Sequence, residues 1–490
     1  MALATSSCQH IAPQPMMAPA LQRSLEERPL GVAPVRAYAD ALAAQSPDPG
    51  AAFDSEDGLS LREGLAVALW YNPDLRITRI EMDQAAAIAK ATGRWPDPEI
   101  SGSRGRQRIT ETEERSITLP KPAWSGIETD GMGNVTRMPR IEGIEEKTFS
   151  WDADKITRSW INMGSLSITV PISGRLGAEK RYRRSEHRVR ELRVAESEIL
   201  VLQRVRDAWY QWSSAAERAK LLDDHLQSLV RLSETAESLA AVGELPASRA
   251  RLFVIERLRK EADRDRERAR ETELHASLLH LLGLLPDSPV QLVPQMNSKE
   301  NPLPDANIDD HPAVQRALAE YEATEFRLKF ELRKQYPDLT FSPTYTKEKY
   351  ETAFVLGLGF PLPIWNANRQ GIAEAVGARE IARAKVENEF LRVKSEHAQA
   401  LAALDGARTQ RTRLYDAVVP VTDRQLSEVM ALANAGEIDF VLLYETLVQI
   451  LETKLELLNA TLAESIAASR LSAIEGTDIP VIDAFAEKEE

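Results

Sequence analysis

Few side chains in this sequence have a type and spacing that could do chemistry. His275 and His280 are a candidate pair of metal ligands, but they are five residues apart. Two ligands on the same face of a helix are three or four residues apart, so this spacing does not favour a metal site. Cys8 is the only cysteine, so one chain can form neither a disulfide nor a Cys-based zinc site. The sequence also has no nucleophile elbow, Walker loop or dinucleotide fingerprint. These features predict no enzyme, no cofactor and no metal site.

Cys8 could instead carry a lipid. The run Leu3-Ala4-Thr5-Ser6-Ser7-Cys8 resembles the end of a bacterial lipoprotein signal, with small residues before the cysteine that is acylated with palmitate. The usual Leu three places before the cysteine is missing, and the charged and apolar regions that should precede it are absent or cut off. Residues 9–58 are rich in Pro, Ala and Gln, a composition typical of disorder. Two interpretations of 1–58 therefore remain equally open, a truncated lipoprotein signal and a plain disordered leader.

The charge of the chain bears on its partners. The formal net charge is -14, whereas general binding of nucleic acid needs a basic surface that displaces counterions from phosphate. One local stretch is basic; it contains Arg175, Lys180, Arg181, Arg183, Arg184, Arg188, Arg190 and Arg193. It holds a single aromatic residue, Tyr182, and mixed charges follow it. We interpret it as a solvated helix face and predict no nucleic-acid partner.

Four structural signals occur twice, in the same order, along the 490 residues. The matched pairs are, in order, Asn72-Pro73 and His311-Pro312, Trp95-Pro96-Asp97 and Tyr336-Pro337-Asp338, the strand ends 168–171 and 358–361, and the turns 241–244 and 434–437. Proline is tolerated in a first helical turn and pushes its preceding residue out of the helical region. We predict two repeats, 59–288 and 309–476, a linker over 289–308 and a tail over 477–490.

Each repeat should contain two very long helices. They are expected over 175–242 and 246–284 in the first repeat and over 367–435 and 438–475 in the second. A helix of about 65 residues is about 100 Å long, longer than a single globular core needs. Apolar residues three or four apart, such as Leu447, Leu451 and Leu455, indicate coiled-coil packing. On these stripes alone, a coiled-coil scaffold protein remains open.

Four short segments show the alternation of strands. They lie near 98–108, 162–171, 338–347 and 352–361. In the last three, large apolar residues alternate with small or hydroxylated ones; the apolar set is Leu166, Ile168, Val170, Leu339, Phe341, Tyr345, Phe354, Leu356, Leu358 and Phe360. This alternation suits a wall with lipid on one side and a wet lumen on the other. No apolar run is long enough for a transmembrane helix, so a membrane location would have to use strands.

The first of these strands is irregular. Arg104, Arg106 and Arg108 would crowd a membrane wall, so either the strand ends near Ser103 or these arginines lie at the aqueous rim. The residues 109–161 have no counterpart in the second repeat, and we expect them to form an extracellular loop.

With this doubled order of helix, two strands, long helix and returning helix, the chain resembles the TolC family of outer-membrane factors over residues 59–476. The resemblance implies a mainly helical fold with a small β part, in which long antiparallel coiled-coil helices accompany four strands per chain. It implies a homotrimer with one twelve-stranded β-barrel in outer-membrane lipid and a helical periplasmic tunnel. It also implies two partners, a periplasmic adaptor and an inner-membrane pump, and Cys8 favours the resistance-nodulation-division type of pump.

The implied function is that of a passive exit duct in the outer membrane of a Gram-negative bacterium. The turns at Gly243, Glu244, Gly436 and Glu437 are then the expected adaptor contacts. The family narrows its periplasmic tip with an acidic ring. Counting from Gly436, Glu445 falls on one position of that ring, Leu442 falls where a second acid is common, and Asp439 could substitute for that acid.

Overall fold

The computed structural model describes residues 12–45, 53–54, 57–296, 308–348, 351–434 and 440–476. These residues form two compact units. The sheet unit consists of Gly93–Ala178 and Phe330–Gln370, and the helical unit comprises the other described residues. Cys8, Gly436, Glu437 and Asp439 lie outside the described residues, so their predicted roles stay predictions.

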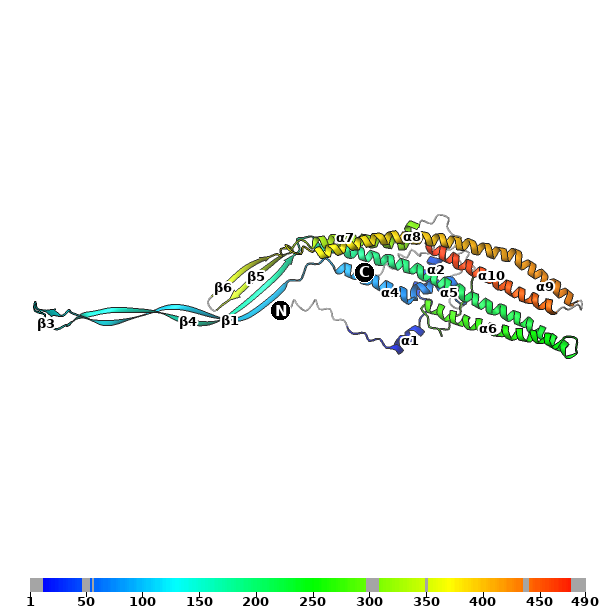
Figure 1. Ribbon diagram of the computed structural model, residues 1–490, viewed down its shortest axis with the longest axis horizontal. Helices are drawn as coiled ribbons and strands as arrows, with labels where there is room; N and C mark the ends of the chain where they lie inside the picture. The colour runs from blue at the N-terminus through cyan, green and yellow to red at the C-terminus, as the bar shows by residue number, and fades with distance from the viewer. Residues whose placement is uncertain are drawn as a thin grey trace. The chain divides into compact units, whose positions relative to one another are not determined.

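The same order of elements occurs twice (Figure 1). The first repeat contains α3 (Leu61–Tyr71), α4 (Pro73–Ala91), β1 (Glu99–Trp124), the short β2 (Glu128–Thr129) and β3 (Val135–Arg137), β4 (Ile141–Val170), α5 (Arg175–Ala241) and α6 (Ala247–Leu281). The second contains the 3-10 turn Ile308–Asp310, α7 (Pro312–Arg333), β5 (Leu339–Lys347), β6 (Thr352–Gly359), α8 (Arg369–Arg413), α9 (Val419–Asn434) and α10 (Phe440–Glu475). The predicted fold class, long helices with a small antiparallel sheet, is confirmed.

The residues before the two matched prolines act as helix caps. The Asn72 side chain accepts a hydrogen bond from the backbone N–H of Leu75 at 3.1 Å. Its amide nitrogen donates to the carbonyl oxygen of Leu281 at 2.8 Å, which ties the start of α4 to the end of α6. In the second repeat, Nδ1 of His311 accepts from the N–H of Ala313 at 3.2 Å. Each side chain satisfies a backbone donor that a helix start leaves without a partner.

The predicted helix over 367–435 is divided into three parts. A π-helical turn, Leu414–Val418, separates α8 from α9, and the N–H of Val419 donates to the carbonyl of Leu414, five residues back. Pro420 follows directly and has no N–H to donate. The wider turn is a local adjustment of the kind that keeps a helix continuous past such a residue.

The prediction of a largely disordered leader over 1–58 is wrong for part of that segment. Two helices, α1 (Ala18–Glu26) and α2 (Ala33–Gln45), are described there. Val35 and Tyr38 of α2 are 0% and 1% exposed in the main core of the helical unit. Arg79 of α4 donates to the Tyr38 hydroxyl at 2.7 Å and pairs with Glu198 of α5 at 2.8 Å. The polar end of the buried tyrosine is therefore satisfied.

The prediction of a loop over 109–161 is also wrong. β1 has 26 residues and β4 has 30, against nine in β5 and eight in β6. Their antiparallel register runs without interruption from Glu99 opposite Ser167 to Ala123 opposite Gly143. β1 does not end near Ser103, and at about 3.3 Å per residue it is about 85 Å long. We call the part of β1 and β4 beyond the ends of β5 and β6, residues 105–161, the ribbon (Figure 1).

Candidate functional site

The four main strands form one antiparallel sheet in the order β1-β4-β5-β6. β1 and β6 are its outer strands, and within the described chain each is hydrogen-bonded to a strand on one side only. An edge strand presents unpaired N–H and C=O groups to its surroundings. The sheet therefore has two edges that require water or another strand.

The register brings the predicted apolar residues of three strands onto one face. Ile168 lies opposite Phe341, which lies opposite Leu358 on the next strand. Val170 lies opposite Leu339 in the next row on one side. On the other side, Pro343 lies opposite Leu356 in the next row, and Tyr345 lies opposite Phe354 in the row after that. We call this face, with Leu166, Ile168, Val170, Leu339, Phe341, Tyr345, Phe354, Leu356 and Leu358, the apolar band. Phe360 follows directly after the end of β6.

Much of the apolar band is exposed. Phe354, Leu356 and Leu358 are 66%, 59% and 69% exposed, whereas Leu166, Ile168 and Val170 are half-buried. A sheet that covered the protein's own core with this face would bury its largest apolar side chains. The apolar band is therefore available to an apolar environment outside the chain.

The other face of the sheet carries mostly small and hydroxylated residues, with Met163 and Val355 among them. The hydroxyl oxygens of Ser101 and Ser165 lie 2.7 Å apart across β1 and β4. Thr169, Thr340 and Gly359 form one row across β4, β5 and β6. Hydroxyl side chains of this kind suit contact with water.

The turn between α5 and α6 is a helical hairpin. Gly243 has φ of +84°, its N–H donates to the carbonyl of Ala240, and the N–H of Glu244 donates to the carbonyl of Leu239. These two bonds close a Schellman motif, in which glycine takes the left-handed position at low energy. Glu244 is exposed at the turn. The sequence predicted this position for Gly243 correctly.

An apolar cluster next to this turn joins the hairpin of α5 and α6 to α10. Its buried members are Leu232, Ala236, Leu245, Ala250 and Phe253, and Phe440, Leu443, Tyr444 and Leu447 of α10 pack against them. The ring of Phe253 lies 6.3 Å from that of Phe440 and 5.8 Å from that of Tyr444, both edge to face. Glu445, one residue further along α10, is exposed.

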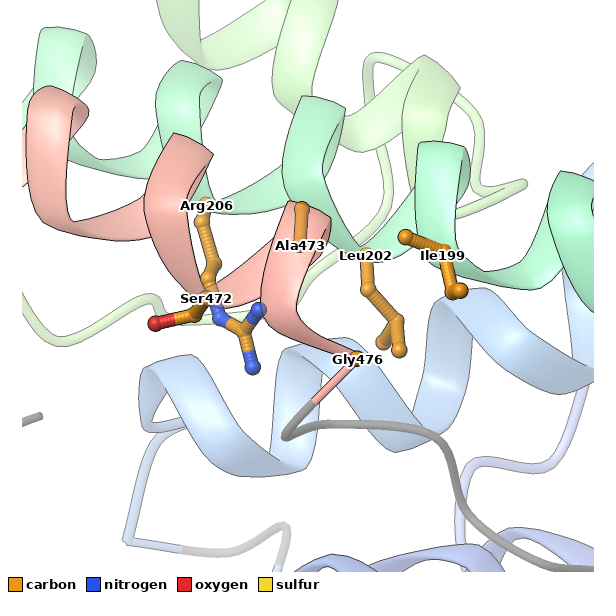
Figure 2. Close-up of a pocket in the computed structure, with 6 residues that line it drawn as sticks. All are labelled: Ile199, Leu202, Arg206, Ser472, Ala473 and Gly476. Carbon is orange, nitrogen blue, oxygen red and sulfur yellow. The ribbon is translucent and has the colours of Figure 1, made fainter. Parts of the chain in front are cut away.

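The other candidates for chemistry have structural explanations. His275 packs its ring against Trp212 at 5.7 Å, and His280 is exposed. The described residues contain no group of three or more His, Cys, Asp or Glu that could hold a metal ion. Figure 2 shows a depression between α5 and α10, lined by Ile199, Leu202, Arg206, Ser472, Ala473 and Gly476, with no room for a small molecule. None of the described helices is long and apolar enough to cross a membrane.

The basic stretch at the start of α5 is paired in part with acids. Arg183 lies 2.7 Å from Glu186, and Arg188 lies 3.1 Å from Glu191. Arg190 reaches Glu81 of α4 at 3.2 Å. This mixture of signs agrees with a solvated helix face.

His225 of α5 makes the helical unit sensitive to acid. It is 8% exposed and its Nε2 has no hydrogen-bond partner. Burial, with a smaller contribution from Lys260, lowers the pKa of the imidazole from 6.5 to about 4. Between these values the unfolded chain takes up a proton that the folded chain does not, so stability that is present above pH 6.5 is lost as the pH falls toward 4.

We expect His225→Leu to remove most of this dependence, which amounts to about 3 kcal/mol over the full range. The melting temperature of the purified protein at several pH values between 7 and 4 measures it. His280→Gln, at an exposed histidine, is the control and should keep the slope of the parent protein. An unchanged slope in His225→Leu would mean that other groups carry the acid sensitivity.

The duplicated order of elements and the two-faced sheet define a fold, that of outer-membrane channels of the TolC type. Solved structures share it: the CmeC outer membrane channel of Campylobacter jejuni is 15% identical, with 90% of this chain and 92% of that chain covered and a TM-score of 0.66. The outer membrane protein VceC of Vibrio cholerae is 13% identical, with 85% and 96% covered and a TM-score of 0.63. The open state of the MtrE channel of Neisseria gonorrhoeae is 14% identical, with 85% and 88% covered and a TM-score of 0.62.

The predicted TolC-like fold is thus confirmed. No protein-family model and no curated protein sequence matches this chain. At such low identity the likeness concerns the fold, and the function must be argued from the residues of this chain.

Proposed function

We propose that three copies of this chain form an exit duct through the outer membrane of a Gram-negative bacterium. The observation that carries the proposal is the exposed apolar band on one face of a sheet whose other face is hydroxylated. Lipid on the outside and water on the inside would satisfy both faces. The similar solved structures are outer-membrane channels, which supports the same location.

The edges of the sheet argue for closure by other copies. An open edge in lipid leaves backbone groups without partners, and each such group costs several kcal/mol. Four strands are too few to enclose a membrane barrel, since the smallest known have about eight. Pairing β6 of one copy with β1 of the next would close twelve strands from three copies.

Membrane fractionation and electrophoresis test this proposal. We expect the protein in the outer-membrane fraction, as trimers that dissociate on heating, and we expect conducting pores when it is added to planar lipid bilayers. A monodisperse protein that stays in solution without detergent would overturn the proposal and favour the alternative, a periplasmic or soluble coiled-coil scaffold. That alternative accounts for the long helices but not for the exposed apolar band.

In this proposal the helical unit forms the periplasmic part of a tripartite efflux system. The turn at Gly243 and Glu244, with the turn predicted at Gly436 and Glu437, would contact a periplasmic adaptor. An inner-membrane pump of the resistance-nodulation-division type would select the cargo, and the duct would conduct it passively. Cys8 would carry a lipid anchor.

Glu445 is proposed as a gate residue at the periplasmic tip, together with Asp439. Three copies of an exposed glutamate on α10 would place three like charges around one axis. We expect Glu445→Ala to widen the closed pore and to raise its single-channel conductance several-fold. Glu456→Ala, on the same helix away from the turn, is the control. Unchanged conductance in Glu445→Ala bilayers would reject the gate role.

A further inference from the structure

A group of basic side chains continues the face that carries the apolar band. The last row of the band is Gly102, Gly164, Tyr345 and Phe354, and the next row on the same face is Arg104, Asn162, Lys347 and Thr352. Arg106 then lies opposite Trp160, and Arg108 lies opposite Arg158. Side chains two residues apart point to the same side of a strand. We call Arg104, Arg106, Arg108, Arg158 and Lys347 the basic belt.

Trp160 holds two of these arginines in place. The guanidinium carbons of Arg104 and Arg106 lie 4.5 Å and 4.7 Å from the centre of the Trp160 ring. Both arginines are exposed, and the tryptophan is 46% exposed. A cation above an aromatic face is attracted to it, and tryptophan beside basic residues is typical of a membrane–water interface. Two of the five belt side chains therefore share an aromatic partner on the same face of the sheet.

Within the described part of the chain, the charges of the belt have no acidic partner at ion-pair distance. Among the described residues, no ion pair within 4.0 Å involves any of its five members, while Glu113 on the opposite face of the ribbon pairs with Lys155 at 2.7 Å. Arg108 and Arg158 stand directly opposite each other. Two like charges in this arrangement repel, so the pair is favourable only when an anion lies between them.

We propose that the basic belt binds the phosphate groups of a phosphorylated glycolipid in the outer leaflet. This inference rests on the proposed function, because it takes the apolar band as the surface in contact with lipid. The belt begins one row, about 7 Å, beyond the last row of the band. A lipid whose chains cover the band would therefore have its headgroup on the side of the belt. Arginine binds phosphate through two parallel N–H donors, and four arginines give the belt this geometry. A lipid source is favoured over free phosphate because the belt is continuous with the lipid-facing surface.

The experiment compares two variants that each lose four positive charges from the same hairpin. The belt variant is Arg104→Gln, Arg106→Gln, Arg108→Gln and Arg158→Gln. The matched control is Arg115→Gln, Lys121→Gln, Arg137→Gln and Arg140→Gln, all exposed and nearer the far end of the hairpin. The full-length protein is placed in nanodiscs of phosphatidylcholine with increasing amounts of lipid A, and bound lipid A is counted by native mass spectrometry.

We expect the belt variant to bind lipid A at least about tenfold more weakly than the parent protein, since each basic residue near an anionic surface contributes a factor of about five and four are removed. The control should bind as the parent does, and an excess of inorganic phosphate should not displace the lipid. Equal binding by the belt variant, or an equal loss in the control, would overturn the proposal. Displacement by inorganic phosphate would also overturn it, because the belt would then be a site for the free ion.

Pore formation separates this proposal from the function on which it rests. If the parent protein forms no pores in pure phosphatidylcholine bilayers, the proposed duct fails. If it forms pores and the belt variant still binds lipid A normally, only the basic belt fails.

Discussion

Leu356→Arg is expected to prevent the protein from entering the outer membrane, whereas Val355→Arg, at the next residue of the same strand, is expected to leave insertion intact. Leu356 lies in the centre of the apolar band, between the rows of Phe354 and Leu358. A charge facing lipid near the bilayer midplane costs about 2 to 4 kcal/mol, and three copies would carry three such charges. Recovery of trimers from the outer-membrane fraction measures the effect.

Val355 is a close control because its side chain is about as exposed as that of Leu356 but lies on the opposite face of the sheet. It is 55% exposed against 59% for Leu356, and it lies on the face with Ser165 and Thr344. In the proposed duct, an arginine there would point into the aqueous lumen. Normal recovery of both variants would contradict the assignment of the two faces. Loss of both would indicate a general defect in folding of the sheet.

Gly283→Ala is expected to destabilise the helical unit strongly. Gly283 has φ of +75°, and a Cβ atom at this position would lie 2.2 Å from the carbonyl oxygen of Tyr71. The left-handed backbone and the collision together are expected to cost about 2 to 5 kcal/mol. Neighbouring groups cannot move easily, because Asn72 and Arg28 are hydrogen-bonded to the carbonyls of Leu281 and Gly283. The melting temperature and the resistance of the protein to protease should both fall.

Gly243→Ala separates the two contributions. Gly243 also ends a helix, with φ of +84°, but a Cβ atom there meets no heavy atom within 4 Å. We expect it to lose only about 1 kcal/mol, from the backbone conformation alone. Similar melting temperatures for the two variants would show that the contact between Gly283 and Tyr71 does not restrict the backbone.

The sequence contained strong signals for the repeated elements. The proline landmarks placed the starts of α4 and α7 because proline acts through its own ring and missing N–H, without help from distant residues. The alternation in β5 and β6 gave the correct faces, since a period of two fixes the side of every residue once one is known. Gly243 was placed correctly for a similar local reason.

The structure differs from the sequence-based predictions in two segments, one with a weak local pattern and one whose composition suggests disorder. The segment around Tyr38 is rich in Ala and Pro and was assigned to a disordered leader, yet Val35, Tyr38 and Leu42 are spaced to share one helical face. The hydroxyl of the buried Tyr38 is hydrogen-bonded to Arg79, which pairs with Glu198, and both residues lie far away in the sequence. No local rule could supply those partners.

The ribbon was missed because many charges and several glycines occur within it. Ile117 and Leu119 alternate with Ser116 and Thr118, and Phe149 and Trp151 alternate with hydroxyl residues in the same way. The register pairs Ile117 with Phe149, which explains why both strands continue. The pairing was not predictable, because either segment alone is too short and too polar to decide its partner.

The sheet ends in two different strands, β1 on one side and β6 on the other. A ring closed by such edges joins its members head to tail, so every copy must supply two sound but unlike surfaces. A subunit with one defective edge strand would prevent closure of any ring into which it is incorporated. In the proposed trimer, with random mixing and equal expression of damaged and sound chains, about one ring in eight would contain only sound chains, so the damaged chain would suppress the function of the sound one.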